Sequence, residues 1–221
     1  MARLPRLCIA GVPHLVVQRS QPGLALFDDA MDRRIYLDAL REAARQQGIA
    51  VHAWGLFASE ARLLATPASA DSFGRALQSV GRRFAAAFNR RHDRSAGLWR
   101  GRFRAVPVDP ASRLIDCLRY VEQAGDDARA SSAPHHGGER ADPLITDHAA
   151  WWQLGNTPFD REVSYRRLRE QALTPEEVAR IEAALRGGWP LGPAGFVGAF
   201  QGAHPRRLLP MAPGRKKTVP V

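Results

Sequence analysis

The sequence predicts an α+β protein with a ferredoxin-like fold, in which a split βαβ pattern forms an antiparallel sheet with helices on one face, followed by a C-terminal helical extension. The first observation is the order of the apolar segments: strand, helix, strand, strand, helix, strand. The second is their periodicity, because short β-branched runs alternate with stretches in which apolar residues recur every three or four positions. The third is a change of composition after residue 125, where a polar segment precedes further helical sequence.

The first half of the pattern contains three strands and one helix. Residues 12–19 are aliphatic and β-branched, which predicts a strand. A helix is predicted over residues 28–47, because two aspartates open it, apolar residues follow at helical spacing, and Gly48 ends it. Residues 49–57 and 61–66 predict two further strands joined by a short turn.

The second half contains a long helix, a strand and another helix. A single apolar stripe predicts a helix over residues 71–91, and residues 103–108 predict the fourth strand. Asp109 and Pro110 then predict a helix start, with Asp as the N-cap and Pro at the first helical position. The buried side of that helix is expected to carry Leu114, Ile115, Leu118 and Val121.

The chain is expected to divide into four parts. Residues 1–125 form the main domain, and residues 126–142, rich in small and polar residues, form a loop in which His135 and His136 are exposed to solvent. Residues 143–192 contain a capping box and form a helical appendage. Residues 193–221 form a basic, flexible tail.

The charge of the chain favours a polyanionic partner. The formal net charge is +10 in 221 residues, and lysine occurs only at Lys216 and Lys217. Arginine suits phosphate, because its planar guanidinium donates two parallel hydrogen bonds. A bias toward GC-rich codons is an alternative reason for the abundance of arginine.

Cysteine usage and hydropathy indicate a cytoplasmic protein. Cys8 and Cys117 are far apart and outside any CxxC pattern, which favours a reducing compartment. There is no apolar run that would form a signal peptide, and none approaches the roughly 20 residues of a membrane span. We therefore expect no membrane partner.

The segment between Arg75 and Arg104 carries the clearest binding signal. It holds nine arginines and a single acid, Asp93. Arginine can neutralise phosphates while Trp and Phe offer faces for base stacking, which is how proteins hold single strands. The alternative is a solvated helix face next to two core aromatics. The residues that we expect to contact nucleic acid are Arg82, Arg83, Arg90, Arg91, Trp99, Arg100, Arg102 and Arg104.

Tyr120 is the candidate nucleophile. It lies about 200° around its helix from Leu118, so it need not be a core residue. A tyrosine hydroxyl can attack a phosphodiester and hold DNA as a covalent phosphotyrosine. Packing or a surface hydrogen bond is the alternative role.

Seven short stretches carry a family resemblance. They are PRL at 5–7, GVPHLVVQR at 11–19, FNRRH at 88–92, LWRGRF at 98–103, CLRYVE at 117–122, ADPLIT at 141–146 and WPLG at 189–192. Their order and spacing over residues 3–192 resemble those of the REP-associated tyrosine transposases, a group within the HUH superfamily of single-strand DNA endonucleases. The resemblance implies a ferredoxin-like HUH domain, recognition of hairpin-forming single-stranded DNA, and a nucleophile at Tyr120. It adds Arg19, in the second stretch, to the expected DNA contacts, and it leaves open whether the protein is a monomer or a homodimer.

The sequence departs from that family at the metal site. The family has two histidines separated by one residue on the third strand, and an asparagine one turn after the tyrosine. In this sequence these positions hold Glu60, Arg62 and Ala124. Glutamate can ligate magnesium, but arginine has no free lone pair and its charge repels a cation. We therefore expect no cofactor, with Mg²⁺ or Mn²⁺ bound only if the site is active. A salt bridge between Glu60 and Arg62 is the expected arrangement, and a phosphate clamp by Arg62 beside Tyr120 is the alternative.

The sequence thus predicts a transposase-like protein that binds structured single-stranded DNA and is catalytically degenerate at its metal site. One alternative is an active metal-dependent transposase or nickase that cleaves single-stranded DNA through a Tyr120 phosphotyrosine. Another is a basic RNA-binding or regulatory scaffold.

Overall fold

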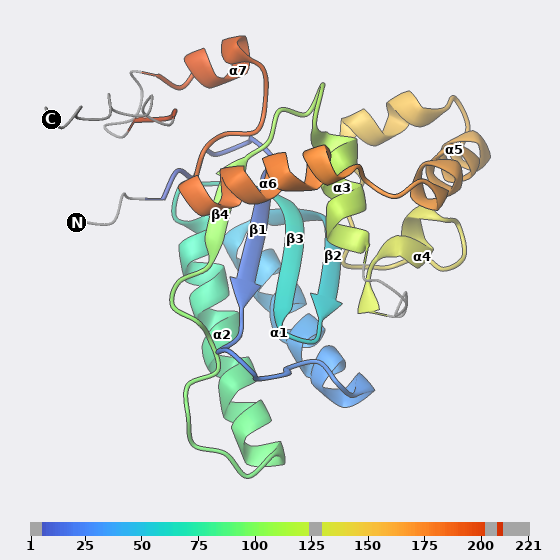
Figure 1. The fold of residues 1–221 in the computed structure, drawn as a ribbon. Coiled ribbons are helices and arrows are strands. Elements are labelled where there is room, and N and C mark those ends of the chain that lie inside the picture. Colours follow the sequence, from blue (N-terminus) through green and yellow to red (C-terminus); the bar gives the residue numbers. More distant parts are fainter. Residues whose placement is uncertain (1–5, 124–129, 202–206, 210–221) are drawn as a thin grey trace, which may run out of the picture.

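The computed structural model describes residues 6–123, 130–201 and 207–209 (Figure 1). The elements follow in the order predicted for a ferredoxin-like domain and then continue as helices. They are β1 (His14–Arg19), α1 (Ala30–Gln47), β2 (Ile49–Phe57), β3 (Glu60–Pro67), α2 (Ser72–Arg91), β4 (Arg104–Pro107), α3 (Leu114–Glu122), α4 (Ala133–His136), the 3₁₀ helix η2 (Ala149–Leu154), α5 (Pro158–Glu170), α6 (Pro175–Gly187) and α7 (Ala194–Gly198).

The four strands form one antiparallel sheet in the order β2-β3-β1-β4. Strand β1 is central and pairs with β3 on one side and β4 on the other. Its register places Val17 opposite Arg62 and Arg19 opposite Glu60. Directly opposed residues in a sheet share a face, so the register already brings three charged side chains together.

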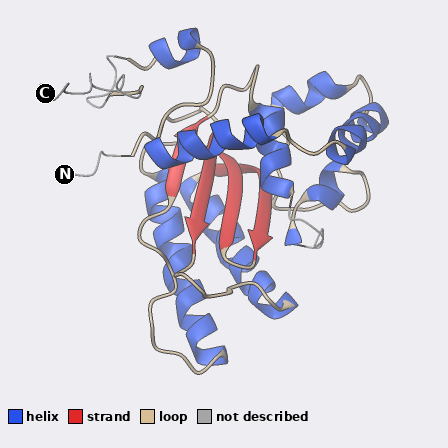
Figure 2. Ribbon diagram, in the orientation of Figure 1, coloured by secondary structure: helices blue, strands red, loops and turns tan. Residues whose placement is uncertain are grey.

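Helices cover both faces of this sheet (Figure 2). Val16 points to the side where α1 and α2 pack, whereas Leu15 and Val17 point to the side of α3 and α6, because successive residues of a strand face opposite ways. The helices α1 and α2 thus cover one face as predicted. The sequence did not show that α3 and the C-terminal extension cover the other face.

Helix α3 packs closely against the sheet at Gly55 of β2. A Cβ atom at Gly55 would lie only 2.0 Å from the carbonyl oxygen of Val121, so a larger residue would push the helix away. The predicted start of this helix at Asp109–Pro110 was wrong, because α3 begins at Leu114. Asp109 instead accepts hydrogen bonds from the backbone and hydroxyl of Ser112 and stabilises a separate turn.

The ends of α1 match the sequence prediction. Asp29 is the N-cap and accepts a hydrogen bond from the backbone nitrogen of Asp32. Gly48 ends the helix with a φ of 61°, a left-handed conformation that favours glycine.

The segment predicted to be a loop is ordered where the structure describes it. Residues 124–129, including Ala124, lie outside the described residues. Residues 130–142 pack against β2 and contain α4, and Ser132 bonds to the backbone of Trp54. The predicted exposure of His136 was wrong: it is 1% exposed and bonds to the buried Glu122.

The C-terminal extension is helical, as predicted for residues 143–192, and it includes α5, which the sequence analysis did not identify. Residues 194–198 form α7 rather than a tail, while the basic residues at 206 and 215–217 lie outside the described residues. Among the described helices, none combines the length and apolarity that a membrane crossing requires.

Candidate nucleic-acid interface

A groove of about 720 Å³ runs between α2 and residues 97–103. We call it the α2 groove. One wall consists of α2 residues one turn apart, from Gly74 to Ala85, and the other consists of the segment that the sequence analysis identified by its mixed arginines and aromatics. Gln18 of β1 also lines it.

Three arginines line the α2 groove: Arg6, Arg82 and Arg102. Among the described residues that line it, none is an acid. Arg82 and Arg102 are exposed. The pKa of Arg6 is lowered first by burial and then by the positive charge of Arg102, so the two cations lie close enough to repel each other. A bound phosphate would relieve that repulsion.

Two aromatic rings lie in the wall opposite α2. Trp99 is half-buried against Tyr36 and Phe84, with ring centroids 6.3 and 5.9 Å away, and its Nε1 lies 3.4 Å from the carbonyl oxygen of Gly81. The Arg6 guanidinium stacks 3.8 Å from the centroid of the Phe103 ring. The groove lining thus contains both cations and aromatic rings.

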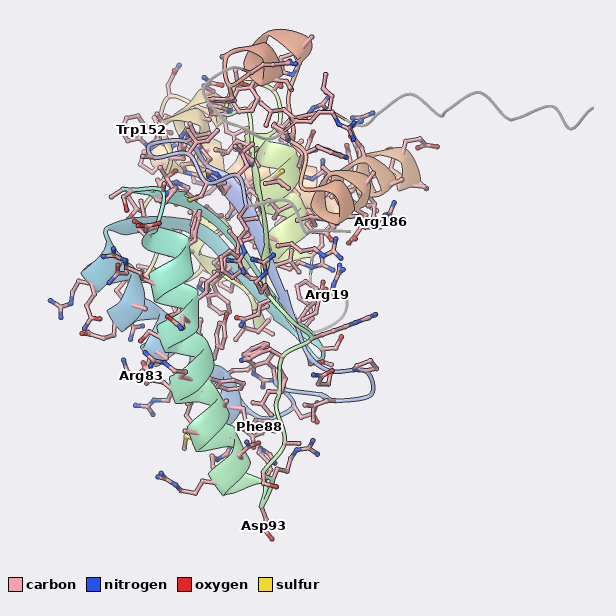
Figure 3. The ribbon with its side chains drawn as sticks, turned by 90° about the vertical axis from the view of Figure 1, so that its left-hand side faces the viewer. Arg19, Arg83, Phe88, Asp93, Trp152 and Arg186 are labelled. Carbon is pink, nitrogen blue, oxygen red and sulfur yellow. The ribbon has the colours of Figure 1, made fainter. Side chains whose placement is uncertain are left out.

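The structure separates the predicted DNA-contacting residues into three groups. Arg82, Trp99 and Arg102 line the α2 groove, while Arg83, Arg90 and Arg100 are exposed but lie outside it. Figure 3 shows Arg83 on the side of α2 away from Phe88 and from the segment after Asp93.

The remaining arginines are bound to the protein itself. Arg91 forms ion pairs with Asp29 and Asp32, which pin the end of α2 to the start of α1. Arg104 donates to the carbonyl oxygens of Leu185 and Arg186 at 3.0 and 2.9 Å. Arg19 is held in the site described next.

The groove also includes two residues, Arg6 and Gln18, that the sequence analysis did not select. Gln18 could have been found from the alternation of β1, which places it on the same face as Val16. Nothing in the sequence shows that the chain before β1 brings Arg6 beside Phe103.

Tyr120 is buried, contrary to the expectation that it need not be a core residue. It is 3% exposed, and its hydroxyl donates a hydrogen bond to Glu182 of α6. Tyr120 does lie on a different side of α3 from Leu118, but α6 crosses α3 and the sheet and covers the tyrosine (Figure 1). Glu182 was not anticipated, because it is 62 residues away from Tyr120 in the sequence.

Arg19, Glu60 and Arg62 join Tyr120 and Glu182 in one network, which we call the Tyr120 site. Glu60 accepts from Arg62 Nε at 2.5 Å and from Arg19 Nε at 2.7 Å. Arg19 also reaches Glu182 at 3.2 Å. The expected salt bridge between Glu60 and Arg62 is therefore present.

Arg62 is further held by aromatic and backbone contacts. Its guanidinium lies between the rings of Phe57 and Tyr120, 4.0 and 4.2 Å from their centroids, and it donates to the Tyr120 carbonyl oxygen at 2.8 Å. The guanidinium nitrogens that Arg62 would need to clamp a phosphate thus already donate to Glu60 and to the Tyr120 carbonyl oxygen.

The electrostatics keep Tyr120 protonated. Burial raises the pKa of Tyr120 well above its usual value; the charge of Arg62 opposes this shift, and the hydrogen bond to Glu182 adds to it. For Glu182, burial acts to raise the pKa, but the hydrogen bond from Tyr120 and the charge of Arg19 outweigh it and lower the pKa. A protonated tyrosine beside a carboxylate is a stable hydrogen-bonded pair.

The residues present at the Tyr120 site do not suit a divalent cation. Two guanidinium groups lie within hydrogen-bond distance of the Glu60 carboxylate, where a metal would have to approach. Their fixed positive charges repel a cation, and they offer no lone pair to it.

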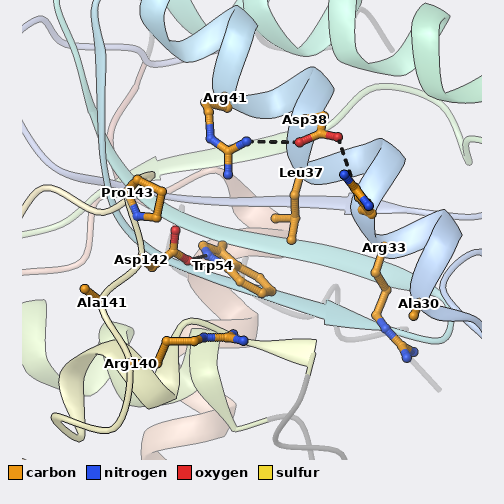
Figure 4. Close-up of a pocket in the computed structure, with 11 residues that line it drawn as sticks. Ala30, Arg33, Leu37, Asp38, Arg41, Trp54, Arg140, Ala141, Asp142 and Pro143 are labelled. Carbon is orange, nitrogen blue, oxygen red and sulfur yellow. Dashed lines mark hydrogen bonds and ion pairs between the residues drawn. The ribbon is translucent and has the colours of Figure 1, made fainter.

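A second groove, of about 650 Å³, lies between α1 and residues 140–143 (Figure 4). It is also rich in arginine, but it contains acids as well. Asp38 lies 3.0 Å from Arg41 and 3.9 Å from Arg34, and Asp142 accepts from the indole of Trp54 at 2.7 Å. Its charge is therefore partly neutralised from within, unlike that of the α2 groove.

Two solved structures are similar to this chain. One, described as "Structure of the REP associates tyrosine transposase bound to a REP hairpin", matches with a TM-score of 0.53 and 13% identity, over 68% of this chain and 96% of that chain. A second, a "putative transposase from deinococcus radiodurans r1", matches with a TM-score of 0.39 and 21% identity, over 56% of this chain and 98% of that chain. No family model and no curated protein matches the sequence. The resemblance inferred from the sequence is thus confirmed at the level of the fold.

Proposed function

We propose that this protein binds single-stranded DNA adjoining a hairpin, and that the unpaired strand lies in the α2 groove. The observation that carries the proposal is the composition of that groove: three arginines and two aromatic rings, without an acid among its described residues. Phosphates would pair with the guanidinium groups while bases stack on the rings.

A hairpin with an unpaired extension fits this interface better than duplex alone. Stacking on Trp99 or Phe103 requires a base face that a paired strand does not offer. Arg83 and Arg90 are exposed outside the groove, so they add positive charge to the surface of α2 without lining the site of the unpaired strand. The neighbour of similar fold bound to a REP hairpin supports this substrate class.

We propose further that the protein binds DNA without cleaving it. The Tyr120 hydroxyl is buried, protonated and bonded to Glu182, so an incoming phosphodiester has no access to it. The residues at the Tyr120 site also lack the means to hold a metal that would stabilise charge on a scissile phosphate.

The binding proposal is tested with a labelled hairpin carrying a single-stranded extension. The double variant Arg82→Ala/Arg102→Ala is expected to bind about 10- to 100-fold more weakly and to show a salt dependence reduced by about two counterions. The matched control Arg83→Ala/Arg90→Ala removes the same charge outside the groove. Its loss of binding free energy should be less than half of the loss in Arg82→Ala/Arg102→Ala. Equal losses in the two variants would mean that DNA binding follows net charge alone.

The cleavage proposal is tested with the same hairpin in the presence of magnesium or manganese. Wild type and Tyr120→Phe should both leave the DNA intact and form no covalent adduct on a denaturing gel. An adduct that wild type forms and Tyr120→Phe does not would instead establish an active tyrosine nickase.

A further inference from the structure

Gln18 is a buried polar residue without an evident role in the fold. It is 7% exposed, and its side-chain oxygen has no hydrogen-bond partner among the described residues. Leaving a buried amide unpaired costs free energy, so such groups are rare unless something completes them. Gln18 also lines the α2 groove, where a ligand could do so.

The floor of the groove brings the Gln18 amide next to Trp99. A Cβ atom built at Gly81 would lie 3.2 Å from Trp99 Nε1 and 3.5 Å from Gln18 Nε2, so both nitrogens converge on one point of α2. Rotation of the amide by half a turn exchanges its oxygen and nitrogen, so either can face the groove. Glycine at position 81 leaves room for this pair, because a Cβ atom there would press on Trp99 Nε1 and require it to shift slightly.

The alternation of side chains along β1 explains why Gln18 lies on this floor. Gln18 follows His14 and Val16 on the face of α1 and α2, at the end of β1 where the core opens into the groove. The lining beside it includes the aromatic residues Trp99 and Phe103 and the charged residues Arg82 and Arg102. A base bound in this part of the groove would lie next to the amide.

We propose that Gln18 recognises one unpaired base of the bound strand, and that this base is adenine. An amide presents one donor and one acceptor side by side, and adenine offers the complementary pair through its amino group and a ring nitrogen. Where proteins read bases directly, glutamine commonly forms two hydrogen bonds to adenine. This inference rests on the proposed function, because it assigns base selectivity to the same groove.

The test compares hairpins whose four-nucleotide extension is all adenine, cytosine, guanine or thymine, or lacks bases. Wild type should bind the adenine extension about 5- to 100-fold more tightly than the base-free one and at least 5-fold more tightly than the other three. Replacing each adenine by purine, which lacks the amino group, should abolish that preference without any change in the protein.

Two protein variants separate recognition from structure. Gln18→Met keeps the length of the side chain but cannot pair with a base, so its preference for adenine should fall below about 2-fold, whereas its salt-dependent binding persists. Its melting temperature should equal or exceed that of wild type, because an unpaired amide is replaced by an apolar group. The matched control, Gln46→Met on the exposed side of α1 and outside the groove, should keep the preference.

The outcomes distinguish this inference from the proposed function. Equal binding of all extensions, a preference for another base, or unchanged selectivity in Gln18→Met would overturn the assignment while leaving DNA binding intact. Absence of binding to any hairpin would instead overturn the proposed function.

Discussion

The Tyr120 site and the α2 groove lie on opposite faces of one sheet, and both combine arginines with aromatic rings. Strand β1 contributes one residue to each site: Gln18 points into the groove, and the next residue, Arg19, points into the Tyr120 site. In the Tyr120 site, Glu60 and Glu182 neutralise the two arginines. In the groove, the described lining residues include no acid.

The difference shows that the number of arginines does not identify a binding surface. A guanidinium that already has a carboxylate contributes to the fold, whereas one without a carboxylate is available to a phosphate of a ligand. The position of the nearest acid, which the tertiary structure decides, separates the two roles. We therefore expect substitutions on one face to change stability and substitutions on the other to change binding.

The largest effect is expected from Arg62→Ala. This variant leaves Glu60, whose side chain is 11% exposed, with one cation instead of two and removes the stacking on Phe57 and Tyr120. We expect a loss of about 3 kcal/mol in the free energy of unfolding, measured by denaturant titration. Arg82→Ala is the control and should change stability by less than about 0.5 kcal/mol. Similar losses in both variants would contradict the contrast between the two faces.

The next largest effect on the free energy of unfolding is expected from Glu182→Gln, and this effect should depend on pH. The charged carboxylate accepts from Tyr120 and Arg19, and its loss is expected to cost about 2 kcal/mol at neutral pH. Because the pKa of Glu182 is lowered in the folded state, its contribution is present above the ordinary value of 4.5 and is lost as the pH falls through the folded-state pKa. The difference in unfolding free energy between wild type and variant should therefore shrink below pH 4.5. A difference that stays constant down to pH 2 would show that Glu182 acts through packing alone.

A smaller change is expected from Tyr120→Phe. It removes the hydroxyl that donates to Glu182 but keeps the ring that stacks on Arg62. Thermal unfolding should show a loss of about 1 kcal/mol, and affinity for the hairpin should stay within about 2-fold of wild type. Strongly weakened DNA binding would mean that Tyr120 takes part in the interface despite its burial.

The smallest effects concern two glycines of α2 that line the groove. At Gly74, a Cβ atom would meet nothing within 4 Å, so Gly74→Ala should stabilise the helix by up to about 1 kcal/mol with little effect on DNA binding. At Gly81, the same change presses on Trp99 and Gln18, so it should weaken hairpin binding several-fold. Binding assays and thermal melts of both variants check this, and equal affinities would show that the floor of the groove is not contacted.

Local pattern was sufficient for most of the secondary structure. The bounds of β2 match the prediction, and those of β1, β3, β4, α1 and α2 differ from it by a few residues, because their apolar periods and their caps are local signals. The start of α3 was missed because Asp109 caps a turn as readily as a helix. The salt bridge between Glu60 and Arg62 was foreseen because residues two apart on a strand share a face.

The sequence by itself determined the order of the elements, the face of β1 on which each side chain lies, and the cluster of arginines and aromatics near residues 75–104. Only the tertiary structure decided that α6 covers Tyr120, that Glu182 neutralises Arg19, and that Arg6 and Gln18 enter the α2 groove. The physical reason is range: periodicity and capping act within a few residues, whereas burial and ion pairing depend on which distant segments meet.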